Sequence, residues 1–569
     1  MARTVAIGEQ DFRRIIENDS FYIDKTDFIK EWWESRDTVT LITRPRRFGK
    51  TLTMSMLQYF FSVSHAGSGL FHHLSIWKSE EYQKLQGTYP VIFLSFAGIK
   101  ADNYEETYYE ICRLTAREYR RFAFLMESGC LLRSDRDYFE KVLSGSANES
   151  DICSALNLLS EYLYDYYKKK VIILLDEYDT PMQEAYAGGY WEKLAGFMRR
   201  LMNAAFKTNM YLERAVMTGI TRVGRESVFS DLNHLEVITT TSKKYAEVFG
   251  FTQDEVFSAL DEFGLKEYAE DIRRWYDGFC IGGIDSIYNP WSVLKFLKEK
   301  EFAPYWANTS SNRLIGRIIC RSDVSVKLRI EELLHGKSIM EPLDEEIVFS
   351  DLETNKSAIW SLLLAGGYLK VTKIVKNRRG KREYELSLTN MEVRMIFDDM
   401  AVSWFSNNRL RYSDFSDALL SGDKEYMNEY LNEIAMDTFS FFDTGSKPSE
   451  FRQPENFYHG FVLGLTADLR QLYQVTSNRE SGYGRYDVLL EPYHPSLDDG
   501  IILEFKICSP EVEDSLEDTV QAAIRQILDK NYAAVLEKKC SKDRIRVYGF
   551  AFQGKKIRID GGYLRELEI

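Results

Sequence analysis

Residues 38–61 read TVTLITRPRRFGKTLTMSMLQYFF. The run TVTLIT, rich in β-branched residues, predicts a buried strand, and TLTMSMLQYFF predicts a helix. The loop between them, residues 44–50, holds three arginines and one lysine. A loop that joins a strand to a helix N-terminus turns its amides toward one point and suits an anion. The stretch therefore predicts a phosphate-binding loop within an α/β fold.

The loop fits the general phosphate-loop pattern GxxxxGK[ST] except at its first position, where Arg44 replaces glycine. Gly49, Lys50 and Thr51 match the pattern. In that pattern Lys50 would reach the β and γ phosphates of a nucleotide, and the Thr51 hydroxyl would ligate Mg²⁺. Three arginines would add positive charge for the phosphates: Arg44, Arg46 and Arg47. The alternative interpretation of the loop alone is a basic surface turn ahead of an ordinary helix.

Three further apolar runs continue the pattern of buried strands along the N-terminal part. They are VIFLSF (91–96), VIILLD (171–176) and RAVMTGI (214–220). Helical stretches at about 103–126 and 190–207 separate them. Apolar strands that alternate with helices predict a parallel sheet covered on both faces. We therefore expect a P-loop-type NTPase domain over residues 1–250.

The run VIILLD ends in a carboxylate, Asp176, and a second carboxylate, Glu177, follows it directly. A phosphate loop needs a carboxylate at the end of a neighbouring strand to hold Mg²⁺, and Asp176 is placed to do so. Glu177 would then orient or deprotonate an attacking water. An acidic strand end is common in α/β proteins. Together with the loop, however, it predicts a nucleotide site at the carboxyl ends of the strands.

The stretch TGITRV, residues 218–223, follows the fourth strand and is a third candidate element. Thr218 or Thr221 could sense a γ phosphate, and Arg222 or Arg225 could stabilise charge in the transition state. An arginine that acts across a subunit boundary would require a homo-oligomer, whereas Arg222 could also act within its own chain. The equally good alternative is that these arginines only pair with acidic neighbours.

The remaining chain divides into a middle region and a C-terminal domain. Residues 251–450 predict a mainly helical middle or lid region, interrupted by one β-hairpin, YLKVTKIV and REYELSLT joined by KNRRGK. This region contains no motif with evident chemistry. The Gly-, Ser- and Pro-containing stretch 443–454 predicts a linker. Residues 451–569 then predict a separate small α/β domain.

The C-terminal domain places two carboxylates and a lysine at strand spacing. Asp487 begins one predicted strand, and Glu504 and Lys506 alternate on another. Side chains alternate between the faces of a strand, so Glu504 and Lys506 share a face that Asp487 can meet from the adjacent strand. Two carboxylates would hold Mg²⁺ or Mn²⁺, and the lysine would stabilise charge during phosphodiester hydrolysis. The alternative is a surface strand that carries an ordinary ion pair.

These motifs resemble those of bacterial AAA-ATPase-like proteins that carry a C-terminal PD-(D/E)XK nuclease domain. The resemblance covers nearly the whole chain. Its motifs are YIDKT (22–26), TRPRRFGKT (43–51), IILLDEYDTPM (172–182), TGITRV (218–223), VFSDLNHL (228–235), FGFTQDEV (249–256), WYDGF (275–279), YNPWSV (288–293), FYHGFVLGL (457–465), SNRESGYGRYDVLLE (477–491) and AAIRQILDKNY (522–532). An arginine at the first loop position belongs to that family's pattern.

The resemblance implies several further features. ATP with Mg²⁺ would be the cofactor of the N-terminal domain, and Gln526 would lie beside the nuclease site. Glu455 or His459 could complete the metal shell, although a packing role suits His459 better. Glu480 falls in the family's pattern just before the catalytic strand and is equally ambiguous.

Composition limits the partners. The chain holds 73 Lys and Arg against 87 Asp and Glu, so its formal charge is 73 − 87 = −14. This excludes a polybasic coat protein for nucleic acid. Residues 451–569 contribute only 16 − 19 = −3, so the acidity lies mainly outside the predicted nuclease domain.

The spacing of the cysteines and the length of the apolar runs indicate the cellular compartment and bear on zinc binding. The seven cysteines lie far apart and show neither zinc-ligand nor disulfide spacing. The longest apolar stretch, residues 359–369, is about half the ~20 residues that a membrane span needs. We therefore expect a cytoplasmic protein that does not enter a membrane.

Two functions are compatible with these features. The first is an ATP-dependent protein, an ATPase, that regulates cleavage of nucleic acid, DNA in preference to RNA, by its C-terminal domain. The alternative is a nucleotide-dependent switch or assembly protein whose C-terminal domain binds nucleic acid without cutting it.

Overall fold

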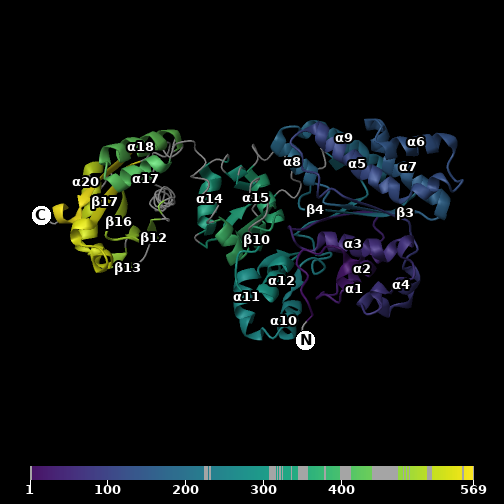
Figure 1. Cartoon of the computed structure of the whole chain (residues 1–569), viewed down its shortest axis with the longest axis horizontal. Helices are drawn as coiled ribbons and strands as arrows, with labels where there is room; N and C mark the ends of the chain where they lie inside the picture. Colours follow the sequence, from purple (N-terminus) through teal and green to yellow (C-terminus); the bar gives the residue numbers. More distant parts are fainter. Residues whose placement is uncertain are drawn as a thin grey trace. The chain divides into compact units, whose positions relative to one another are not determined.

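The computed structural model describes residues 3–222, 228–229, 232–306, 315–316, 318–319, 322, 324–334, 336–343, 356–376, 380–397, 412–438, 469, 472–477, 480–481, 484–485, 487–508, 515–553 and 556–567. Contacts between residues divide it into two compact units, Met1–Phe397 and Asp398–Ile569. Each unit has its own sheet and core and is described separately below (Figure 1).

A five-stranded parallel sheet forms the centre of the first unit. Its order is β2-β3-β4-β1-β5, so β4 lies between the strand that leads to the phosphate loop and the strand that ends in Asp176. All five residues of β1 and all six of β3 are buried, as expected for a sheet covered on both faces. The strands are β1 (Val39–Thr43), β2 (Val91–Ser95), β3 (Val171–Asp176), β4 (Leu212–Gly219) and β5 (Leu235–Ile238).

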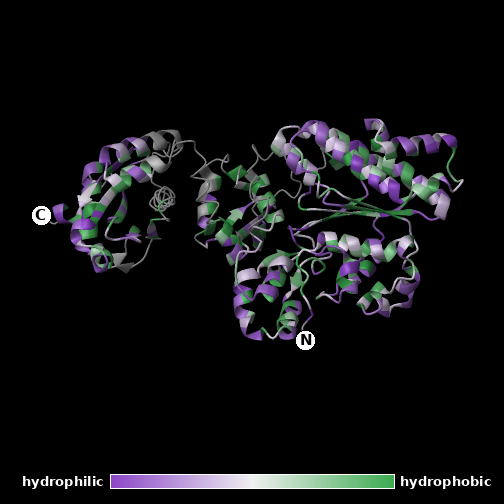
Figure 2. Ribbon diagram, in the orientation of Figure 1, coloured by the Kyte–Doolittle hydropathy of each residue, from purple (hydrophilic) through white to green (hydrophobic). Residues whose placement is uncertain are grey.

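Helices cover both faces of this sheet, which confirms the predicted α/β class. In Figure 1, α2 and α3 lie on one side of the strands and α5, α7 and α9 on the other. Figure 2 shows that the strands between these layers are predominantly hydrophobic. The helices are α2 (Asp27–Ser35), α3 (Lys50–Phe61), α5 (Tyr104–Arg121), α7 (Glu149–Tyr167) and α9 (Trp191–Met202).

The rest of the first unit begins with three helices and a small sheet of order β6-β8-β7. Its apolar side chains form a core of their own, which includes Val256, Ile272 and Phe296. The elements are β6 (Phe251–Thr252), α10 (Gln253–Glu262), α11 (Ala269–Tyr276), β7 (Phe279–Ile281), β8 (Ile284–Tyr288) and α12 (Pro290–Glu299). The short strands β6, β7 and β8 were not predicted, because runs of two to five residues give little periodic signal.

The predicted hairpin is present and belongs to a three-stranded sheet. β10 (Leu369–Lys376) pairs with β11 (Arg382–Leu388), which also pairs with β9 (Ile339–Glu341). Two helices precede the hairpin, α14 (Val324–Leu334) and α15 (Lys356–Ala365). From Ala358 to Leu364, α15 is buried throughout.

The second unit contains a mixed sheet of order β12-β15-β16-β17-β18. Its central pair, β16 and β17, is parallel, and the other pairs are antiparallel. The helix α20 (Leu516–Asp529) packs on one face, where Ile524 contacts Ala551. The strands are β12 (Tyr473–Ser477), β15 (Val488–Pro492), β16 (Gly500–Ile507), β17 (Ile545–Gln553) and β18 (Lys556–Tyr563).

Two helices that the sequence assigned to the middle region belong to this second unit. α17 (Tyr412–Ser421) and α18 (Lys424–Thr438) share a core with β16, in which Phe415 and Leu431 pack with Phe505. The division of contacts therefore falls at Phe397/Asp398 rather than near residue 450. The start of the predicted C-terminal domain, residues 451–472, lies outside the described residues apart from positions 469 and 472.

Candidate functional site

The phosphate loop takes its shape from two residues with positive φ. Arg47 has φ 64° and Gly49 has φ 79°, and Gly49 lies at the N-terminus of α3. Glycine adopts this left-handed conformation without the steric cost that a Cβ brings. The Lys50 ammonium folds back over the loop and donates to the carbonyl oxygens of Arg44 at 3.0 Å and Pro45 at 2.9 Å. Burial lowers the pKa of Lys50.

Three hydroxyls converge on the Asp176 carboxylate at the end of β3. Thr51 Oγ1 donates to Asp176 Oδ2 at 2.9 Å, and Thr218 Oγ1 donates to Oδ1 at 2.6 Å. Ser95 Oγ, at the end of the adjacent strand, donates to Oδ2 at 3.1 Å. Burial raises the pKa of Asp176, and the bond from Thr218 opposes that shift. The predicted partners Thr51 and Asp176 are therefore brought together.

Ser95 was missed by the sequence prediction, although a signal for it existed. It is the last residue of β2 and pairs in register with Asp176. The run VIFLSF has one polar residue, Ser95, at its last position but one, at the level where VIILLD ends in its carboxylate. A comparison of the two strand ends would have placed Ser95 at the site.

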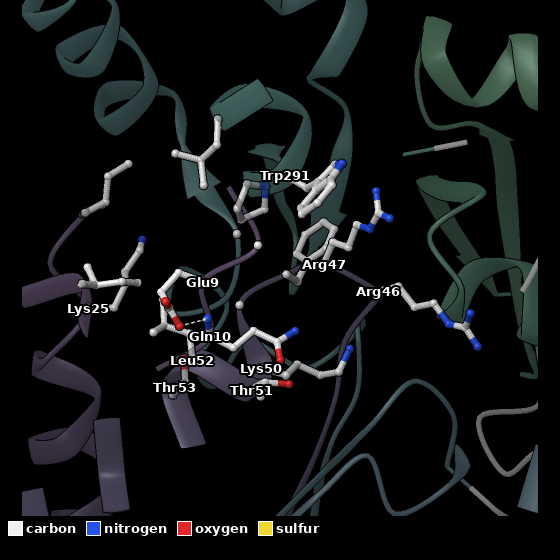
Figure 3. Close-up of a pocket in the computed structure, with 18 of the residues that line it drawn as sticks. Glu9, Gln10, Lys25, Arg46, Arg47, Lys50, Thr51, Leu52, Thr53 and Trp291 are labelled. Carbon is white, nitrogen blue, oxygen red and sulfur yellow. Dashed lines mark hydrogen bonds between the residues drawn. The ribbon is translucent and has the colours of Figure 1, made fainter. Parts of the chain in front are cut away.

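A cavity of about 570 Å³ opens beside the loop, within the usual range for small-molecule sites. Gly49, Lys50 and Thr51 line one part of it, together with Glu177. Figure 3 shows Lys25 and Trp291 around the same space, on segments remote from the loop in sequence. Lys25 lies in the YIDKT motif and Trp291 in YNPWSV, motifs to which the sequence alone assigned no function.

The position of Arg44 differs from the prediction that its side chain adds positive charge for the phosphates. Its side chain is completely buried and does not line the cavity. The guanidinium donates to the carbonyl oxygens of Thr43 at 2.9 Å, Thr239 at 2.8 Å and Tyr245 at 3.1 Å. Desolvation lowers the pKa of Arg44 to about 9. The side chain braces the loop from beneath instead of presenting charge to a phosphate.

The other two arginines line the cavity and also contact neighbouring segments. The Arg47 guanidinium lies 3.9 Å from the centroid of the Trp291 ring and donates to the Tyr305 carbonyl at 3.0 Å. Arg46 extends away from Lys50 in Figure 3 and donates to Gln183 Oε1 at 3.4 Å. Both positive charges are thus near the loop, but Arg47 is already engaged in a cation–π contact.

The loop backbone is also in contact with the segment that carries the hairpin. The Trp306 indole nitrogen donates to the Arg46 carbonyl at 3.2 Å. A Cβ on Gly367 would approach both the Pro45 ring and the Phe279 ring to 2.9 Å, so the Pro45 ring packs against the Gly367 backbone. Contacts of the phosphate loop therefore extend directly to the start of β10.

The third predicted element is organised by Asp179, which the sequence analysis did not single out. Asp179 Oδ2 accepts from the amides of Ile220 at 3.0 Å and Thr221 at 2.9 Å, and from Thr221 Oγ1 at 2.9 Å. Arg222 follows this turn but does not line the cavity. Arg225 lies outside the described residues.

Among the C-terminal candidates, Glu504 lies on the face of the sheet that α20 covers, and Asp487 directly precedes β15. Asp487 Oδ2 accepts from the Phe505 amide at 2.8 Å, which fixes this carboxylate against β16. Glu504 is 3% exposed, and its Oε1 accepts from the Gln526 side-chain amide on α20. That amide also donates to Tyr532 Oη at 3.2 Å. Lys506 lies two residues beyond Glu504 on β16, so the alternation of the strand gives both the same face.

Two family models match this chain, one in the N-terminal part and one in the C-terminal part. Residues 6–229 match the family model "Predicted AAA-ATPase", and residues 453–561 match the model of the PD-(D/E)XK nuclease superfamily. The chain thus carries a stretch that matches predicted AAA-ATPases, followed by one that matches the PD-(D/E)XK nuclease superfamily. The resemblance inferred from the motifs is thus confirmed for both ends of the chain.

One relative and one solved structure are similar to this chain. An uncharacterized protein in the vnfD 5' region of Azotobacter chroococcum mcd 1 is 24% identical over 396 residues, which cover 69% of this chain and 68% of that protein. The ORC2 protein of Aeropyrum pernix, in ADPNP–ADP complexes, is 12% identical with a TM-score of 0.22, over 66% of this chain and 93% of that one. The second similarity is too weak to bear on fold or function.

The donor set of the nuclease-superfamily domain fits a divalent cation. Asp487 and Glu504 supply two carboxylates, and Mg²⁺ is commonly held by one or two carboxylates with waters and phosphate oxygens as its other ligands. No group of three His, Cys, Asp or Glu side chains gathers around one point among the described residues. Glu455 and His459 lie outside those residues, as does the Glu480 side chain.

Within the described part of the chain, no helix is both long and apolar enough to cross a membrane.

Proposed function

We propose that the N-terminal unit binds and hydrolyses ATP with Mg²⁺, and that this controls metal-dependent phosphodiester cleavage of nucleic acid by the C-terminal unit. One observation carries the nucleotide assignment: the hydrogen bond from Thr51 to Asp176 beside the cavity. A hydroxyl from the first turn of α3 and a carboxylate from the end of β3 form the pair that holds Mg²⁺ at a phosphate loop.

Each residue of this site has a definite role in the proposal. Thr51 and Asp176 would hold the cation, which neutralises phosphate charge when bound. Lys50 would exchange its two backbone carbonyls for phosphate oxygens. Glu177 lines the cavity directly after Asp176 and would orient the attacking water. Its φ of 50° turns the chain sharply after the strand.

At the C-terminal site, Asp487 and Glu504 would hold Mg²⁺ or Mn²⁺ and Lys506 would stabilise charge on the phosphate. Gln526 would fix the orientation of Glu504 through the hydrogen bond that its side-chain amide donates to that carboxylate. The substrate is nucleic acid, DNA in preference to RNA. Homo-oligomer formation would be needed only if an arginine of one copy completed the nucleotide site of another.

The nucleotide assignment is tested with Lys50→Ala in the full chain. We expect this variant to lose ATP binding in the presence of Mg²⁺, measured by isothermal titration calorimetry. Lys141→Ala is the matched control, because Lys141 is an exposed lysine that does not line the cavity. ATP affinity that Lys50→Ala leaves intact would overturn the phosphate-loop assignment.

The nuclease assignment is tested with Glu504→Gln and Lys506→Ala, with exposed Lys538→Ala as control. We expect wild type and control to cleave DNA in the presence of Mg²⁺ or Mn²⁺ and ATP, and both site variants to be inactive. If wild type binds DNA or RNA but cuts neither under any of these conditions, the nuclease assignment fails. The chain is then a switch or assembly protein that binds nucleic acid without cleaving it.

A further inference from the structure

The hairpin formed by β10 and β11 has a charge that contrasts with the rest of the chain. Residues 370–382 contain seven Lys and Arg and no Asp or Glu, in a chain of formal charge −14. The next acids along the chain are Glu383 and Glu385 on β11. Cationic charge is thus concentrated in the outer half of one supersecondary element.

The described basic side chains of this half are open to solvent. Lys373, Lys376, Lys381 and Arg382 are all exposed. Lys376 pairs in register with Arg382, so two like charges lie opposite each other across the strands. Such a pair is mutually repulsive. A polyanion that lies along the hairpin would remove that repulsion.

The hairpin is held firmly at its base. Tyr384 and Leu386 of β11 are buried, and β9 pairs along the same residues. At the start of β10, Thr389 Oγ1 donates to the Gly367 carbonyl at 2.8 Å. The basic residues are therefore presented on an anchored strand pair, so little ordering is required when a ligand binds.

Protection of the sheet edge alone does not account for this charge. β10 is an edge strand, and lysines on edge strands commonly prevent unwanted pairing. One or two lysines on β10 would serve that purpose. Here the positive charge continues past the strand to Arg382, the first residue of β11, which is the central strand of this sheet.

The arrangement of elements points the same way. The order is helix, strand, helix and hairpin, and the second hairpin strand pairs back to the first strand. Because α15 is buried, it cannot enter a groove of a duplex, and the hairpin is the element that remains accessible.

We propose that the β10–β11 hairpin binds the phosphate backbone of nucleic acid through Lys373, Lys376, Lys381 and Arg382. Phosphate contacts of this kind position a protein on its substrate without reading sequence. The choice of nucleic acid over another polyanion rests on the proposed nuclease function, because the same chain must hold its substrate. The binding itself requires neither nucleotide nor metal.

The test measures binding in EDTA without ATP, so that the nuclease and nucleotide sites do not contribute. Full-length protein is titrated onto a fluorescent 30-base-pair DNA duplex, and anisotropy is followed at several KCl concentrations. The variant K373Q/K376Q/K381Q/R382Q should bind roughly tenfold more weakly or worse. Its slope of log affinity against log salt should fall by about 0.9 for each phosphate that the hairpin no longer neutralises.

A matched control separates the hairpin from net charge. The variant K84Q/K141Q/K266Q/K298Q removes the same number of charges from exposed lysines elsewhere in the unit. It should keep both affinity and salt slope close to wild type. The variant K373R/K376R/K381R keeps the charge and should bind as wild type does, and thermal unfolding must show that every variant is folded.

Three outcomes would overturn the proposal. The first is unchanged affinity and slope in the hairpin variant, and the second is an equal weakening in the control. The third is binding of wild type to vesicles containing phosphatidylserine, through the same four residues, without binding to DNA or RNA. Failure of the nuclease assignment is distinguishable, since wild type would then leave DNA and RNA uncut with metal and ATP while hairpin-dependent binding in EDTA stayed intact.

Discussion

Ser292 and Glu392 form a buried hydrogen bond 100 residues apart in sequence, with Ser292 Oγ 2.9 and 3.1 Å from the two carboxylate oxygens. Both side chains are fully buried. The carboxylate also accepts from the Trp306 amide, and the indole of Trp306 donates to the phosphate loop. Glu392 therefore joins three segments behind the loop.

Glu392 makes the stability of the first unit depend on pH. Desolvation raises the pKa of Glu392 to about 7 from a usual value of 4.5. A carboxyl whose pKa is raised by folding contributes stability below pH 4.5 that is lost as pH rises through 7. Glu392→Gln should therefore gain up to about 3 kcal/mol relative to wild type between pH 5 and pH 8. Urea unfolding at both pH values measures this, and a difference that does not change with pH would contradict it.

Thr218 is the second target, because its hydroxyl donates the shortest bond to Asp176. Thr218→Val keeps the side-chain shape but leaves a buried carboxylate with one donor fewer. We expect a loss of about 1–3 kcal/mol in the free energy of unfolding. Thr218→Ser, which keeps the hydroxyl, is the control and should lose less. Equal stability of the valine variant and wild type would show that the other two hydroxyls suffice.

Arg44 separates a structural role from a ligand-binding role. Arg44→Met fills similar space but removes the donors to four backbone carbonyls, those of residues 43, 238, 239 and 245. We therefore expect a loss of roughly 2–4 kcal/mol in stability. Arg44→Lys should recover little of that loss, because an ammonium cannot reproduce the planar set of donors. Differential scanning calorimetry checks both. A stable Arg44→Met protein that fails only to bind ATP would restore the phosphate-contact interpretation.

Substitution of Gln526 tests what orients the Glu504 carboxylate in the C-terminal site. Gln526→Leu removes the amide that donates to Glu504 and should weaken Mn²⁺ binding by roughly tenfold, as removal of such a supporting hydrogen bond usually does. Titration calorimetry with Mn²⁺ in the absence of nucleic acid gives the affinity. Gln521→Ala, an exposed position on the same helix, is the control. Unchanged Mn²⁺ affinity would mean that Gln526 has no part in ordering the site.

Much of the fold could be predicted because long apolar runs leave few alternatives. β1 and β3 are buried at every position, and a strand buried on both faces gives a continuous apolar pattern. The short strands β6 to β9 have too few residues for a periodic signal. The helices α17 and α18 were placed with the wrong neighbours, because an amphipathic pattern shows that a helix packs but not which sheet it packs on.

The site was predictable where residue chemistry and strand order agreed, as for Thr51 with Asp176. It was not predictable where a side chain had a choice of direction. Arg44 could turn toward a phosphate or beneath the loop, and only the carbonyls supplied by residues 239 and 245 decide between them. Those residues are about 200 positions away in sequence.

The close approach of Gly367 to Pro45 has a mechanical consequence. Because the Pro45 ring packs directly against the Gly367 backbone, the phosphate loop cannot expand on that side unless the segment leading into the hairpin moves with it. A change of loop shape on nucleotide binding would then displace the start of β10, because Pro45 is in van der Waals contact with Gly367. The hairpin would then change its position whenever the wall of the nucleotide site moves.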